Sequence, residues 1–185
     1  MARTDFDDFV KRQQELSAAA EEKIPFDPKK ELAEWLGRLN ALYSDVQAYL
    51  KDYISGGSIS FKIDNKELNE DFSGPYIAPR MVIRIGLQEI RLEPIGTMLI
   101  GSRGRVDVVG PAGTSRLTLM NKKITSAHQL VSVTVIDPKN PPAAKKPIGQ
   151  EIEWAWKIVS RPPALGFIEL NKESFLETLL EVSNG

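Results

Sequence analysis

Apolar residues near the start of the chain recur at helical spacing and predict a helix over residues 4–23. The positions that share its face are Phe6, Phe9, Gln13, Leu16 and Ala20. Asp27 followed by Pro28 predicts the start of a second helix, because aspartate caps helix N-termini and proline is tolerated at the first helical position. The linker between them is short, and we therefore expect the two helices to form an antiparallel hairpin.

The second predicted helix carries an unbroken heptad pattern and ends at Ser55-Gly56-Gly57. Its seam comprises Leu32, Leu36, Leu39, Tyr43, Val46, Leu50 and Tyr53, and a parallel row comprises Trp35, Leu42 and Tyr49. Because this helix is longer than the first, its later part overhangs its partner. We therefore predict that Tyr49, Leu50 and Tyr53 form an interaction surface that rests on the sheet or on another subunit.

From Ser58 onward the apolar period changes to two, which indicates antiparallel strands with one buried face and one solvated face. The alternating apolar positions are Ile59, Phe61 and Ile63; Met81, Ile83 and Ile85; Ile90 and Leu92; Val106 and Val108; Leu117 and Leu119; Val131, Val133 and Val135; and Ile152, Trp154, Trp156 and Ile158. Glycine-containing turns separate several of these runs. The proline-rich segment 137–149 is predicted to be an exposed loop or partly disordered.

These patterns predict one α+β domain over residues 1–185. A helical hairpin (4–55) packs on a largely antiparallel sheet of about six to eight strands (58–170), and a C-terminal helix (171–185) is capped by Asn171. The length of 185 residues is ordinary for one domain.

Composition removes several kinds of chemistry. The chain has no cysteine and one histidine, His128, which excludes disulfides, thiolate nucleophiles, iron–sulfur clusters and zinc sites with several imidazoles. We therefore expect no metal and no cofactor. The acidic N-terminus lacks the apolar core of a secretory signal, and no apolar run approaches the roughly 20 residues that span a bilayer. The expectation is a cytoplasmic protein that makes no membrane contact.

Charge is distributed unevenly along the chain, with a formal charge of −5 in residues 1–73, +5 in residues 74–123 and −1 in residues 124–185. The candidate binding arginines of the basic part are Arg80, Arg84, Arg91, Arg103, Arg105 and Arg116. Strand alternation places several of them on the solvated face, where they could bind the phosphates of a nucleic acid or another polyanion. Glu89, Glu93 and Asp107 fall on the same face, and cross-strand ion pairs are the competing interpretation.

Other candidate sites are better explained by structure. The turn from Gly101 to Arg105 does not match a phosphate-binding loop, and no Gly-x-Ser-x-Gly motif accompanies His128. The acidic set of Asp64, Glu67, Glu70 and Asp71 lacks the ligand spacing of an EF-hand. Period two assigns Trp154 and Trp156 to the apolar face, where we expect them to anchor the helical hairpin.

Three functional classes follow. The sparse catalytic chemistry and the overhanging aromatic residues favour a non-catalytic protein-interaction, assembly or regulatory module that binds a protein partner or self-associates. The alternative is a small anion- or nucleic-acid-binding module that uses the arginine face. The weakest is a carboxylate-based hydrolase.

Overall fold

The computed structural model describes residues 27–71, 73–97, 102–126, 152–160 and 166–184. They form an α+β fold in which helices pack on a seven-stranded antiparallel sheet. In this part of the chain a single helical segment precedes the sheet, α2 (Pro28–Tyr49) continued by the short α3 (Lys51–Ser55). The helical hairpin is therefore not confirmed, because its predicted first helix lies outside the described residues, as do the predicted strand around Val133 and the loop 137–149.

The start of α2 agrees with the capping signal in the sequence. Asp27 has an extended backbone, and its Oδ1 accepts hydrogen bonds from the backbone N–H groups of Lys29 (3.0 Å) and Lys30 (3.3 Å). The predicted long helix is interrupted at Leu50, after which α3 continues to Ser55. No helix of the described residues has the length and apolar character needed to cross a membrane.

The sheet is a meander in which each strand pairs with its neighbours in the chain, in the order β1 to β7. The strands are β1 (Ile59–Glu70), β2 (Gly74–Ile85), β3 (Gln88–Gly96), β4 (Arg105–Gly110), β5 (Gly113–Asn121), β6 (Trp154–Val159) and β7 (Phe167–Glu169). Gly86 has φ of 58° in the tight β2–β3 turn, where a residue with a side chain would be strained. Pro111 and Ala112 connect β4 to β5.

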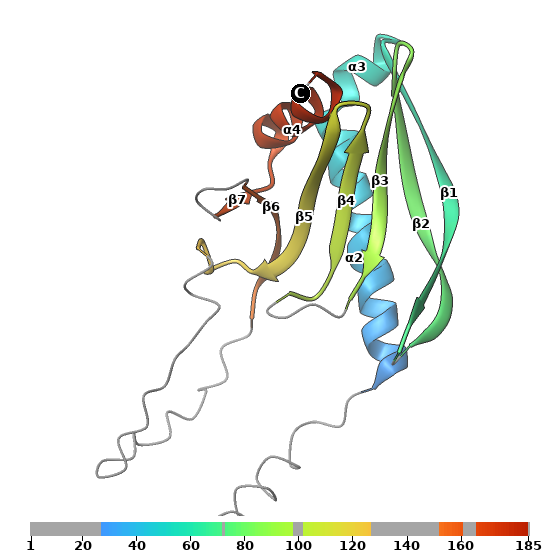
Figure 1. The fold of residues 1–185 in the computed structure, drawn as a ribbon, viewed down its shortest axis with the longest axis vertical. Coiled ribbons are helices and arrows are strands. Elements are labelled where there is room, and N and C mark those ends of the chain that lie inside the picture. Colours follow the sequence, from blue (N-terminus) through green and yellow to red (C-terminus); the bar gives the residue numbers. More distant parts are fainter. Residues whose placement is uncertain (1–26, 72, 98–101, 127–151, 161–165, 185) are drawn as a thin grey trace, which may run out of the picture.

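Helix α2 and the C-terminal α4 (Lys172–Asn184) pack on the same face of the sheet (Figure 1). Both rows of α2 contribute to the core, which includes Leu39, Leu42, Tyr43 and Val46. From the sheet, the core takes mainly the alternating residues of β2 to β5, and from α4 it takes Phe175, Leu179 and Val182. The heptad pattern therefore reflects a helix that packs on a sheet.

The β1–β2 ribbon coils so strongly that it changes the face it buries (Figure 1). Met81 and Ala78 are both fully buried although they lie three residues apart and thus on opposite faces of β2. The pairing of β2 with β3 ends at Met81 and Leu92, and beyond this point the ribbon turns over the end of β3. Glu70 of β1 accepts hydrogen bonds there from the backbone N–H (3.2 Å) and Oγ1 (2.6 Å) of Thr97.

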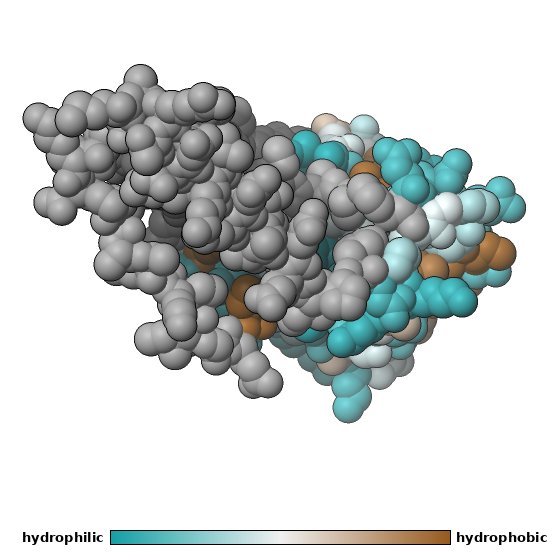
Figure 2. Space-filling view, turned by 90° about the horizontal axis from the view of Figure 1, so that it is seen from below, coloured by the Kyte–Doolittle hydropathy of each residue, from teal (hydrophilic) through white to brown (hydrophobic). Residues whose placement is uncertain are grey.

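The outer side of this ribbon end is exposed to solvent. Seen from below, the surface on the ribbon side is mostly hydrophilic, with a small hydrophobic area among the polar side chains (Figure 2). The large apolar residues of the ribbon that remain exposed are Ile63 (45%) and Ile77 (56%). Strand alternation puts both residues on the same face as Met81 and Ile83, which are buried. Alternation alone therefore does not reveal that Ile63 and Ile77 are exposed.

The chain after β5 crosses β6 and holds a buried lysine. Lys157 of β6 is 3% exposed, and its Nζ donates hydrogen bonds to the backbone carbonyls of Lys122 (2.7 Å) and Ile124 (2.5 Å). Beyond this crossing, the carbonyl of Thr125 accepts a hydrogen bond from the backbone N–H of Phe167 in β7 (3.1 Å). The two carbonyl acceptors account for the burial of a cationic side chain on a strand.

Candidate functional site

Two of the six predicted arginines, Arg80 of β2 and Arg91 of β3, lie on the outer face of the sheet, and acidic side chains engage them. Arg80 donates from Nε to Oδ1 of Asp64 (2.8 Å) and from Nη1 to Oε1 of Glu93 (3.3 Å). Glu93 also lies 3.4 Å from Arg91 and 3.0 Å from Lys66. The Arg80 guanidinium lowers the pKa of the Asp64 carboxyl, chiefly through this hydrogen bond and against the opposing effect of burial.

The remaining outer-face arginines are Arg84, Arg105 and Arg116. Arg84 pairs with Glu89 (3.2 Å), which is its cross-strand neighbour in β3, and Arg105 pairs with Asp107 (2.7 Å). Arg116 is exposed and has no ion-pair partner among the residues that the structure describes. Most of the positive charge on this face is thus already balanced by carboxylates.

Arg103 is separated from the other five. It precedes β4 and lies against the N-terminal part of α2, where Nη1 is 3.4 Å from Glu31 and 3.5 Å from Glu34. Its guanidinium carbon is also 5.0 Å from the ring centroid of Trp154, which is a cation–π contact. The structure therefore does not bring the six arginines together into one stripe.

The predicted interaction residues, which lie between the end of α2 and the middle of α3, have three different environments. Leu50 is 1% exposed and belongs to the core, so it is not available to a partner. The ring of Tyr49 packs on that of Phe175 in α4, with centroids 6.1 Å apart. Tyr53 is 46% exposed. The sheet and α4 of this same chain thus cover most of the predicted interaction surface.

A groove of about 260 Å³ runs between α2 and the β5–β7 side of the sheet, and we call it the aromatic groove. Its aromatic residues are Tyr49, Trp154 and Trp156, all of them half-buried. Trp156 also packs on Trp35 of α2, with ring centroids 6.1 Å apart, so part of its predicted anchoring role is present. The exposed part of these rings forms a wall that a ligand can contact.

The polar residues of the aromatic groove are Arg38 and Asp45 of α2 and Glu169 of β7. Within the described part of the chain, none of these three side chains has an ion pair or a hydrogen bond. Burial raises the pKa of Tyr49, and the nearby Asp45 and Glu169 carboxylates raise it further. Both acids therefore lie near the Tyr49 end, whereas Arg38 is two helical turns from Asp45.

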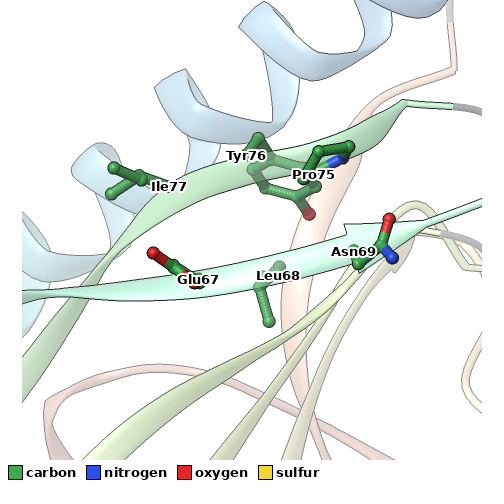
Figure 3. A pocket seen from close by; sticks show the side chains of 6 residues that line it. All are labelled: Glu67, Leu68, Asn69, Pro75, Tyr76 and Ile77. Atoms are coloured by element: carbon green, nitrogen blue, oxygen red, sulfur yellow. The ribbon is translucent and has the colours of Figure 1, made fainter.

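A second hollow, of about 530 Å³, lies at the end of the β1–β2 ribbon. Figure 3 shows the side chains that line it, all from these two strands. Tyr76, one of them, donates a hydrogen bond to Glu70, and burial together with this carboxylate raises the pKa of the phenol. One polar group of this hollow, the Tyr76 hydroxyl, is thus already engaged in holding the ribbon end over β3.

The other candidates do not form a site. Asp64 is held by Arg80 and Glu70 by Tyr76 and Thr97, so the acidic segment does not converge on a common point. Among the described residues, no group of three or more His, Cys, Asp or Glu side chains could hold a metal ion. His128 lies outside the described residues.

Sequence reasoning missed the aromatic groove because its walls come from distant segments. One signal was available on α2, where Arg38, Ala41, Asp45 and Tyr49 recur at spacings of three and four and mark a stripe beside the buried rows. No family model, curated protein or solved structure matches this chain.

Proposed function

We propose that this protein is a non-catalytic interaction module that binds a segment of a partner protein in the aromatic groove. The observation that carries this proposal is the combination of half-buried Trp154, Trp156 and Tyr49 with ionisable side chains that lack partners within the described residues. Aromatic residues and arginine are enriched at the energetic centres of protein interfaces.

The chemistry of the groove favours a partner segment that carries a lysine or an arginine. Asp45 and Glu169 provide negative charge at one end, and the indole rings can accept a cation on their faces. Trp154 already accepts the guanidinium of Arg103 in this way. Arg38, at the other end, suits a carboxylate or a backbone carbonyl of the same segment.

The two alternative functions have less support. The anion-binding interpretation needs free positive charge, yet Arg116 alone among the six arginines lacks an acidic partner in the described residues. The hydrolase interpretation needs carboxylates that face a common substrate. Asp64 and Glu70 are instead engaged by the protein's own donors.

Crosslinking of the full chain in its native cell, followed by identification of the captured proteins, tests the proposal. We expect Asp45→Lys and Trp154→Ala to remove a captured partner, because the first reverses the charge of the groove and the second removes its wall. Asp52→Lys is the matched control, since it makes the same charge change on an exposed residue of α3. A partner that all three variants retain, or that Asp52→Lys loses equally, would contradict the proposal.

A further inference from the structure

Strand β1 has a neighbour on one side only. It pairs with β2 over its full length from Ile59 to Glu70, and it is the first strand in the order of the described sheet. Figure 1 shows it along the outer edge of the molecule. A strand edge of this length offers unpaired N–H and C=O groups to another strand, and proteins commonly protect such edges with charged side chains.

The charges near the start of β1 follow a pattern that a second copy can complement. Ile63 is 45% exposed, and it lies between Lys62 and Asp64, which point to the other face. Their side chains are 58% and 30% exposed and their charged atoms lie 3.7 Å apart. An apolar residue with opposite charges on its two sides is complementary to itself when the strand is reversed.

We propose that two copies of this chain associate through antiparallel pairing of their β1 strands, with Ile63 opposite Ile63 of the second copy. Lys62 of each copy then faces Asp64 of the other, which gives two equivalent ion pairs on one face. On the opposite face the two Ile63 side chains cover one another. The product is a continuous sheet with a two-fold axis perpendicular to it, and the helices of both copies lie on the same side.

Other registers are less favourable. A register centred on Asp64 places Asp64 opposite itself and Lys62 opposite Lys66, which brings like charges together. A register centred on Asn65 pairs Asp64 with Lys66 but places the apolar Ile63 opposite the charged Glu67. Shifts by one residue would put each buried side chain on the wrong face. The Ile63 register is the one that satisfies both charge and apolar contact.

This pairing is independent of the aromatic groove. Strands β1 and β7 lie at opposite ends of the strand order, and the groove is lined by α2 and by the β5–β7 side of the sheet. Self-association through β1 therefore leaves the groove open to a partner. A failure of either proposal does not affect the other.

Disulfide trapping tests the register directly, because the chain has no cysteine of its own. In the proposed pairing the two Ile63 Cα atoms lie about 4.5–5.5 Å apart, which is within the range that a disulfide bridges. We expect Ile63→Cys to form a crosslinked dimer under mild oxidation and Asn65→Cys to remain largely uncrosslinked. A crosslink in Asn65→Cys alone, or in neither variant, would overturn the proposal.

Sedimentation equilibrium of the full chain measures the association itself. We expect Ile63→Lys to raise the dimer dissociation constant by about tenfold or more, because two lysines then face one another at the centre of the interface. Ile77→Lys is the matched control, since Ile77 is 56% exposed on β2 but does not lie on the free edge. A wild-type protein that stays monomeric at every concentration, or an equal effect of Ile77→Lys, would refute the pairing.

Discussion

The hydroxyl of Tyr43 in α2 donates a hydrogen bond to the backbone carbonyl of Pro79 in β2, at 2.8 Å. The same oxygen is 3.5 Å from the carbonyl of Leu92 in β3. These carbonyls lie where β2 and β3 separate, because the pairing of the two strands ends at Met81 and Leu92. The helix thus supplies a donor at the point where the sheet stops supplying its own. Burial raises the pKa of this phenol well above its ordinary value, so it remains a donor at every physiological pH.

Tyr43→Phe should destabilise the protein by about 1–2 kcal/mol, because it leaves the Pro79 carbonyl without this donor in a largely apolar setting. The free energy of unfolding, measured by urea denaturation, reports the change. Tyr53→Phe is the control, since Tyr53 is 46% exposed and should change stability little. Equal effects of the two substitutions would show that the Tyr43 hydrogen bond stabilises the protein less than its burial indicates.

Gly104→Ala should destabilise the fold by about 2 kcal/mol, because there is no room for the added methyl group. A Cβ at this position would lie 2.2 Å from Cζ3 of Trp35, whose ring is 2% exposed and cannot move aside freely. Thermal unfolding followed by circular dichroism measures the loss.

Gly37→Ala makes the same chemical change as Gly104→Ala, but we expect the opposite effect on stability. Apart from the adjoining residues and the backbone of the helix itself, no atom lies within 4 Å of the Cβ that alanine would add at Gly37, in the middle of α2. Alanine should therefore stabilise the helix by about 0.5–1 kcal/mol. Destabilisation by Gly37→Ala would indicate that something covers this side of α2.

Asp64→Asn should make the free energy of unfolding depend less steeply on pH in the acidic range. The Arg80 guanidinium lowers the pKa of Asp64 below its ordinary value of 3.8, so the stabilisation is fully present above that pH. It is lost as the pH falls through the lowered pKa of the folded state, when the carboxylate becomes protonated. Urea denaturation at a series of pH values from neutral to 2 measures the slope. Glu67→Gln, at an exposed position of the same strand, is the matched control for the loss of a carboxylate.

Local pattern predicted the elements that depend on local physics. The Asp27-Pro28 signal placed the start of α2 correctly because capping involves only adjacent backbone groups. Period two located the strands that carry Ile83, Leu92, Val106 and Leu117, whose side chains are fully buried. In each case the interaction that decides the structure lies within a few residues or within one strand face.

Features that depend on distant segments could not be predicted in this way. Ala78 and Met81 are both buried because the ribbon turns where the pairing with β3 stops, and no property of β2 alone specifies that point. The aromatic groove brings Arg38 of α2 beside Trp154 of β6, more than a hundred positions along the chain. Heptad spacing in α2 likewise does not distinguish a helix partner from a sheet, since both accept the same apolar stripe.

The meander order of the strands has a consequence for how the protein folds. Strands β1 to β5 follow one another closely in the chain, so their hairpins can form one after another with small losses of loop entropy, whereas residues 122–153 separate β5 from β6. Closing the core is different, because Tyr49 and Phe175 meet from near the two ends of the described chain. During synthesis the sheet face that α4 will cover therefore stays open until α4 has left the ribosome, and its apolar side chains are exposed to other molecules during that interval.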